Sequence, residues 1–134
     1  MGRESTMTTH ITLYGIAHCD TVRKSRQWFA SQGVAVTFHD LKKQGVPPEA
    51  LAQWTQALGW QTLLNRRGTT WRQLPAEQQD QAQDDASARA LMQAHPGLIK
   101  RPVAVCQQDD APPRLTVGFA PQDWARWPGA QAAA

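Results

Sequence analysis

The chain has 134 residues, of which 41% are hydrophobic and 19% charged, and its formal net charge is +3. This length and composition fit one globular domain, and no run approaches the ~20 consecutive apolar residues that cross a bilayer. Basic residues alternate with acidic and amide residues instead of forming a stripe, so we expect a small anionic ligand and neither nucleic acid nor a membrane.

The first nine residues resemble neither a secretory signal nor a membrane anchor, and we expect residues 1–9 to be loosely ordered. The two cysteines, Cys19 and Cys106, match no zinc or disulfide framework, and the histidines show no ligand spacing, so we expect no metal. Free thiols are typical of a reducing compartment, which predicts a cytoplasmic protein.

The first predicted elements are a strand, a helix and a second strand. Ile11–Ile16 is short, apolar and rich in β-branched residues, which predicts a buried strand. From Asp20 the apolar residues fall at helical spacing, and Gly33 is a typical helix stop. Val34–Asp40 alternates apolar and polar side chains. It predicts a strand parallel to the first if the helix between them is a right-handed crossover.

Several helices and a hairpin follow. Pro47 and Pro48 suit the start of the first of these helices. The stretch Pro75–Gly97 predicts a further helix, hydrophilic until Ala88, whose first half lies on the surface or frays. The apolar runs 98–106 and 114–119 predict an antiparallel hairpin, 121–127 a short helix, and 129–134 a tail. This order predicts an α/β protein of the thioredoxin fold, with a four-stranded mixed sheet, flanking helices and a helical insertion at about 48–96.

Cys19 stands between the first strand and the first helix. Unpaired N–H groups and the positive end of the macrodipole favour a thiolate at the start of a helix, which predicts a nucleophile. Val22 occupies the second cysteine position of a C-x-x-C motif, so an outside thiol must resolve any adduct of Cys19. Cys106 fits a buried strand residue, and a bridge between the two cysteines requires Cα atoms within ~7 Å.

Two arginine motifs predict anion binding. In "KRPV", Pro102 at the start of a strand predicts either a special turn with a cis peptide after Arg101 or an ordinary strand entry with a solvated arginine. The loop "LNRRGTTWRQL" contains Asn65, Arg66 and Arg67. Guanidinium groups bind carboxylate, phosphate or arsenate oxygens bidentately, so this loop is either a binding site or a solvated basic loop.

The stretches "LYGIAHCDTVRKSRQWF", "LLNRRGTTWRQL" and "HPGLIKRPVAV" together resemble the arsenate reductase (ArsC)/Spx superfamily, most closely its YffB-like branch, over about residues 10–128. The resemblance implies a thioredoxin-like domain with a nucleophilic cysteine at Cys19. It also implies an arginine at Arg101 that binds an oxyanion or thiol substrate, and a cis peptide at Pro102. For the YffB-like branch it implies glutathione-dependent thiol reductase activity.

The chain also departs from relatives in this superfamily. Arsenate reductases have a C-G-T-S-R pattern where this chain has "CDTVR", and their insertion arginine falls near Gln61 here. "VGFAPQDW" lacks the further arginine that they place beyond the hairpin, so arsenate reduction is the weakest of three hypotheses. Spx-type regulators, which bind RNA polymerase, commonly carry C-x-x-C, which is absent here.

The first hypothesis is a monothiol oxidoreductase in which Cys19 attacks a disulfide or oxyanion and Arg101, Arg66 and Arg67 hold anionic groups. Asn65 and Pro102 complete the predicted site. Glutathione acts as co-substrate, glutathione or glutaredoxin resolves the adduct, and no cofactor is bound. The second hypothesis is a non-catalytic interaction module with a protein partner such as RNA polymerase. The substrate, the electron donor and the oligomeric state stay open.

Overall fold

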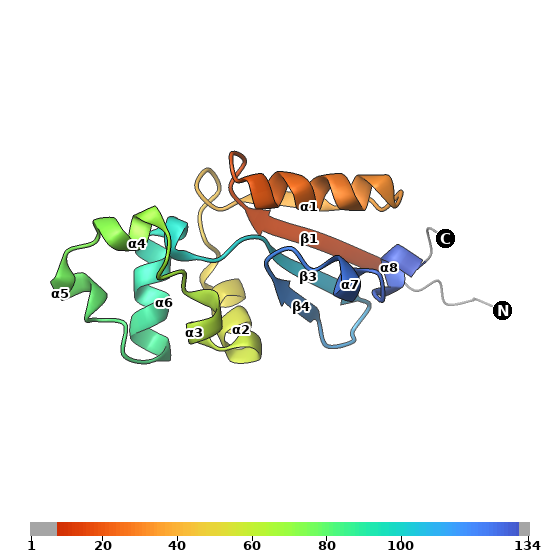
Figure 1. The fold of residues 1–134 in the computed structure, drawn as a ribbon. Helices are drawn as coiled ribbons and strands as arrows, with labels where there is room; N and C mark the ends of the chain where they lie inside the picture. The colour runs from red at the N-terminus through yellow and green to blue at the C-terminus, as the bar shows by residue number, and fades with distance from the viewer. Residues whose placement is uncertain (1–7, 132–134) are drawn as a thin grey trace.

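The computed structural model describes residues 8–131, and Figure 1 shows the arrangement of its helices and strands. The elements are β1 (Thr9–Gly15), α1 (Asp20–Ser31), β2 (Thr37–Asp40), α2 (Pro48–Leu58), α3 (Trp60–Leu63), α4 (Thr69–Gln73), α5 (Ala76–Gln79), α6 (Asp85–Ala94), the 3-10 helix η1 (Pro96–Leu98), β3 (Val103–Gln108), β4 (Arg114–Val117), α7 (Pro121–Trp124) and α8 (Pro128–Gln131). None of the described helices is long and apolar enough to cross a membrane.

The four strands form one mixed sheet in the order β2-β1-β3-β4. β1 pairs in parallel with β2, as the crossover through α1 predicted, and it pairs antiparallel with β3. β3 and β4 form the predicted antiparallel hairpin, in which Val103 pairs with Val117. The predicted α/β fold with a four-stranded mixed sheet is therefore confirmed. β2 begins only at Thr37, so the alternating pattern predicted a strand three residues too long at its start.

The sheet separates two apolar cores. On one face lie Ile11, Leu13, Phe29, Ala104, Cys106, Trp124 and Trp127, which come from β1, α1, β3 and the segment around α7. On the other face the side chains of β3 and β4 pack against the helices of the insertion, with Trp54 of α2 fully buried. The helices α2 to α6 occupy one end of the molecule in Figure 1, and α1 runs along the sheet.

α1 packs closely over the end of β1. Val22, Ser25 and Phe29 are its buried residues, at the spacing of one helical face. A Cβ atom on Gly15 would lie 2.6 Å from a methyl carbon of Val22, closer than van der Waals contact allows. Glycine at position 15 therefore permits this approach, which sets where the first turn of α1 stands relative to the sheet.

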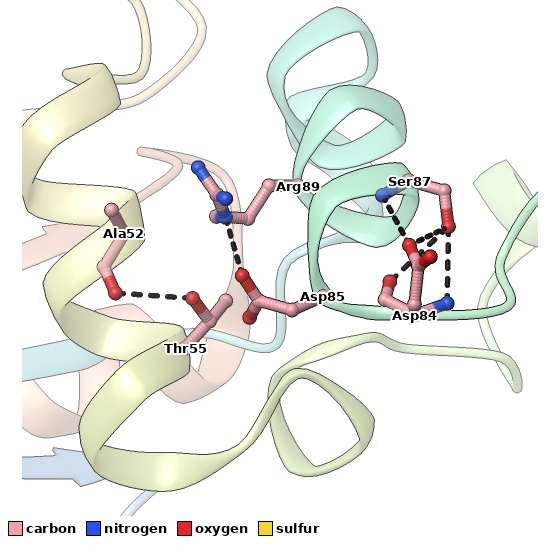
Figure 2. Close-up of polar contacts among 6 residues, drawn as sticks. All are labelled: Ala52, Thr55, Asp84, Asp85, Ser87 and Arg89. Atoms are coloured by element: carbon pink, nitrogen blue, oxygen red, sulfur yellow. Dashed lines mark hydrogen bonds and ion pairs between the residues drawn. The ribbon is translucent and has the colours of Figure 1, made fainter.

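The stretch predicted as one helix from Pro75 is two helices, α5 and α6. α6 begins with a capping box, in which the Asp84 carboxylate accepts the N–H of Ser87 at 2.9 Å, and the hydroxyl of Ser87 accepts the N–H of Asp84 at 3.1 Å (Figure 2). Asp84 and Ser87 thus start a new helix where helical spacing alone predicted continuation.

At both ends of the described chain, regular structure reaches beyond the predicted boundaries. Thr9 already belongs to β1, although we predicted residues 1–9 to be loosely ordered, and residues 1–7 lie outside the described residues. α8 ends at Gln131, inside the predicted tail 129–134, of which residues 132–134 lie outside the described part. The division into a 10–128 domain with an insertion at 48–96 stays a prediction.

Candidate functional site

Cys19 is the N-cap residue of α1. Its backbone is extended, with φ of −82° and ψ of 125°, and its carbonyl accepts the N–H of Arg23 at 2.9 Å, the first bond of the helix. Its own N–H donates to the carbonyl of Ile16 at 3.1 Å, which closes the turn between β1 and α1. The thiol is partly exposed and belongs to a free cysteine. The prediction that Cys19 lies at the start of a helix is therefore confirmed.

The surroundings of Cys19 shift its pKa below the ordinary value for a thiol. Burial raises the pKa and is the largest single effect, but the polar groups and the charge around the sulfur together outweigh it. The backbone amide of Val22, the side chain and positive charge of Arg101 and the backbone amide of Thr21 all lower the pKa of this thiol. These groups favour the thiolate, which is the nucleophilic form of cysteine.

Arg101 reaches Cys19 from the segment before β3. Its Nη1 donates to the carbonyls of Gly97 at 3.0 Å and Ile99 at 3.3 Å, so η1 and the residues after it hold the guanidinium. Its Nε is buried and has no hydrogen-bond partner among residues 8–131. The peptide bond between Arg101 and Pro102 is cis, in agreement with the prediction, and Pro102 itself is buried.

Cys19 and Arg101 lie together in one pocket of about 350 Å³. The pocket is lined by Cys19, Thr21, Asn65, Lys100, Arg101, Val117 and Gly118. Two of these residues are cations and none is acidic, so an anionic or polar group beside the thiol would meet positive charge and N–H donors. We call this hollow the Cys19 pocket.

The structure divides the predicted binding residues between two places. Asn65 lines the Cys19 pocket together with the cysteine and Arg101. Arg66 and Arg67 instead line a neighbouring hollow of about 400 Å³, with Gln61, Leu64 and Lys100. His18, which precedes Cys19 in the chain, is exposed, and the groups that lower the pKa of Cys19 are backbone amides and Arg101.

Four residues that line the Cys19 pocket were not among the predicted site residues: Thr21, Lys100, Val117 and Gly118. Lys100 was part of the quoted "KRPV" motif, but a lysine next to an arginine gives no separate signal. Val117 and Gly118 end the hairpin and meet the cysteine only through the fold. Gly118 has φ of 86°, and its N–H donates to the carbonyl of Pro102 at 2.9 Å, which ties the end of β4 to the start of β3.

Cys106 stands apart from this pocket. It pairs with Ile11, whereas Cys19 follows the other end of β1, beyond Gly15. Ile11 and Gly15 are four residue steps apart along the strand, about 14 Å at ~3.4 Å per residue, which exceeds the ~7 Å that a disulfide spans. Cys106 is 2% exposed, and burial raises the pKa of its thiol. It is a core residue of β3.

Comparison with known proteins places this arrangement in a family. The model of the ArsC family matches residues 14–127, which include the segments that form the Cys19 pocket. An uncharacterized protein of Haemophilus influenzae is 40% identical over 93 residues, which cover 69% of this chain and 81% of that protein.

Two solved structures agree with this match. A YffB protein is 44% identical, with a TM-score of 0.76, and the match covers 86% of this chain and 96% of that one. An arsenate reductase (ArsC) related protein of Brucella melitensis is 42% identical, with a TM-score of 0.63 and coverages of 92% and 96%. The chain therefore belongs to the ArsC family.

Proposed function

We propose that this protein is a monothiol oxidoreductase that uses glutathione as its co-substrate and acts on a disulfide, a mixed disulfide or a small anionic substrate. The observation that carries the proposal is the Cys19 thiol at the start of α1, its pKa lowered by two backbone N–H groups and Arg101. Membership of the ArsC family supports thiol chemistry at this position.

The reaction has two thiol–disulfide exchange steps. The Cys19 thiolate attacks one sulfur of the substrate disulfide, which forms a mixed disulfide on the enzyme and releases the other half as a thiolate. A thiolate of glutathione or glutaredoxin then attacks the outer sulfur of the mixed disulfide, and the electron pair of the broken bond returns to Cys19. The lowered pKa of Cys19 serves both steps, since it supplies the nucleophile and makes Cys19 a good leaving group.

Arg101 and Asn65 are the residues that we assign to hold the bound group. Both line the Cys19 pocket, and the guanidinium is anchored on its far side by the carbonyls of Gly97 and Ile99. A fixed guanidinium binds a carboxylate or other oxyanion at a smaller entropic cost than a free one.

Arsenate is a less favoured substrate. Among the described residues, Arg101 is the one arginine that lines the Cys19 pocket, while Arg66 and Arg67 line its neighbour. An arsenate reductase of the pattern considered above has further arginines for the oxyanion. Arsenate turnover in the presence of glutathione and glutaredoxin would move this substrate ahead of disulfides.

The test begins with the reactivity of Cys19 in a Cys106→Ser background. The rate of its alkylation, followed against pH, should reach its plateau at a pH below that expected for an ordinary thiol, because the thiolate forms early. Cys19→Ser in the same background should abolish glutathione-dependent reduction of a small disulfide such as bis(2-hydroxyethyl) disulfide. An unshifted pKa, or full activity in Cys19→Ser, would rule out the proposed mechanism.

A further inference from the structure

A second basic hollow lies beside the Cys19 pocket. It is lined by Gln61, Leu64, Arg66, Arg67 and Lys100, and Lys100 lines both hollows. We call it the second basic pocket. It contains three cations and no carboxylate. The ion pairs among residues 8–131 join Arg23 to Asp20 and Arg89 to Asp85, so no carboxylate of the described chain neutralises these three charges.

The loop that carries the second basic pocket is fixed to the segment between η1 and Arg101. Leu64 forms a β-bridge with Ile99. On either side of this bridge, the N–H of Asn65 donates to the carbonyl of Leu98 at 2.7 Å, and the N–H of Lys100 donates to the carbonyl of Leu63 at 2.9 Å. These contacts hold the two pockets side by side, so a ligand in the second has a defined position relative to Cys19.

Contacts also hold the side chain of Arg66 and the backbone of Arg67. The guanidinium of Arg66 lies 5.4 Å from the ring centroid of Trp60 and 5.9 Å from that of Trp71. The backbone of Arg67 is fixed on both sides, because the side chain of Asn65 accepts its N–H at 3.0 Å and Arg72 donates to its carbonyl at 2.7 Å. A basic site that is ordered before its ligand arrives loses less entropy on binding.

We propose that the second basic pocket binds the carboxylates of the incoming thiol in the resolving step, while the Cys19 pocket holds the group already attached to Cys19. This inference rests on the proposed function. The incoming thiol loses its proton to solvent, and its thiolate forms a bond to the outer sulfur of the mixed disulfide. The bond from that sulfur to Cys19 breaks, and Cys19 leaves as a thiolate. The incoming thiol is oxidised to a disulfide, and Cys19 is reduced.

The proposed ligand class is a small thiol that bears carboxylates. Planar guanidinium groups pair bidentately with carboxylates, and Arg66 and Arg67 supply two of them. Because the Cys19 pocket has its own arginine, Arg101, a second anionic group does not have to displace the first. The arrangement therefore separates the two thiol-bearing groups that must meet at one sulfur.

The experiment compares two incoming thiols that differ in their carboxylates. The full chain with Cys106→Ser is converted to a mixed disulfide between Cys19 and neutral 2-mercaptoethanol. Loss of this adduct is followed by intact mass after acid quench, with glutathione and with glutathione diethyl ester. We expect glutathione to react about tenfold faster than the ester at matched thiolate concentration, the effect of one or two charge-assisted hydrogen bonds.

Substitutions in the second basic pocket test whether it causes the faster reaction with glutathione than with the ester. Arg66→Gln/Arg67→Gln should lower the rate with glutathione about tenfold and change the rate with the ester less than about twofold. Arg67→Gln is also tested alone, because the loss of Arg66 removes packing from Trp60 and Trp71. Arg126→Gln, an exposed arginine after α7, is the control for loss of one positive charge and should leave both rates unchanged. Circular dichroism establishes that each variant is folded.

The outcomes separate this inference from the proposed function. The proposed role of the second basic pocket would be wrong if the two thiols reacted at equal rates, or if a folded Arg66→Gln/Arg67→Gln variant kept the preference for glutathione. Neither result would affect the lowered pKa of Cys19. Equal losses in the Arg126→Gln control would assign the preference to net charge and would likewise overturn the role of this pocket. An unshifted pKa of Cys19 with no adduct formed from bis(2-hydroxyethyl) disulfide would overturn the proposed function itself, and the inference with it.

Discussion

Groups from two parts of the chain lower the pKa of Cys19. The N–H groups of Thr21 and Val22 belong to the first turn of α1 and are present whenever that helix forms. Arg101 comes from the segment before β3 and is held by the carbonyl groups of Gly97 and Ile99. The helix supplies its share of thiolate stabilisation locally, whereas the arginine depends on the complete fold.

The contribution of Arg101 can be measured by removing its charge. Arg101→Gln removes the guanidinium and its positive charge, both of which favour the thiolate, so the pKa of Cys19 should rise and its alkylation at neutral pH should slow several-fold. The backbone amides of Val22 and Thr21 still lower the pKa, so it should stay below that of the unfolded chain. The measurement is the pH dependence of alkylation in the Cys106→Ser background. An unchanged profile would mean that the helix start alone activates the thiol.

At the scale of elements, η1 connects the helical insertion to the reactive site. The carbonyl of Gly97 in η1 accepts a hydrogen bond from Arg101, and Gly97 also lies against Thr70 of α4. A Cβ atom on Gly97 would come within 2.4 Å of the hydroxyl oxygen of Thr70. The contact between α4 and η1 therefore fixes the anchor of the arginine, although neither helix touches the thiol.

Gly97→Ala tests this connection. The added methyl group overpacks the contact, so we expect a loss of about 1–3 kcal/mol in the free energy of unfolding and a rise in the pKa of Cys19 as Arg101 loses its anchor. Thr70→Ala/Gly97→Ala removes the hydroxyl and a methyl group from the clash and should restore most of both quantities. Thr70→Ala alone serves as the control. Urea denaturation measures the stability, and alkylation rates measure the pKa of Cys19. If the double variant regained its stability but the pKa stayed raised, the contact would support packing without positioning Arg101.

Local patterns predicted the elements whose cause is local. The strand before Cys19, the helix after it and the hairpin each follow from a few neighbouring residues, and all three are present. The division between α5 and α6 was missed because the capping residues Asp84 and Ser87 lie in the part of the stretch before Ala88, which is hydrophilic. Helical spacing gives little information where no apolar face marks the core.

At the scale of the whole molecule, the site joins segments that are far apart along the chain. Cys19, Asn65, Arg101 and Gly118 belong to four separate segments. Sequence motifs singled out the first three residues because each has distinctive chemistry. The separation of Asn65 from Arg66 into neighbouring pockets depends on how the loop is paired with Leu98–Lys100, a long-range contact that the sequence does not display.

The pH dependence of the stability should show how much the carboxylate of Asp40 stabilises the folded protein. The buried carboxylate of Asp40 accepts the N–H groups of Lys43 and Lys42. These groups, with the charge of Lys43 and the backbone amide of Ala17, hold the pKa of Asp40 below the ordinary value against the opposing effect of burial. Ala17 belongs to the turn that leads to Cys19. Because the pKa is lower in the folded state, the carboxylate stabilises the fold above its unfolded pKa of about 3.9 and loses this effect as the pH falls through the folded pKa.

Asp40→Asn should therefore lower the urea midpoint at pH 7, and its difference from the parent protein should shrink as the pH falls from about 5 to about 2. Asp110→Asn, in the exposed loop between β3 and β4, is the control for loss of a carboxylate. A difference for Asp40→Asn that stays constant over this range would show that shape, rather than charge, accounts for its effect.

The contact between Val22 and Gly15 has a consequence for how an oxidised molecule recovers. Val22 is fully buried against Gly15, where a C-x-x-C protein has its second thiol, and Cys106 is too distant to replace it. An adduct on Cys19 therefore has no rescue from within the chain, and its lifetime is set by the concentration of reducing thiol outside. Under the proposed mechanism, the fraction of protein that carries an adduct would follow the ratio of oxidant to reducing thiol in the surrounding solution.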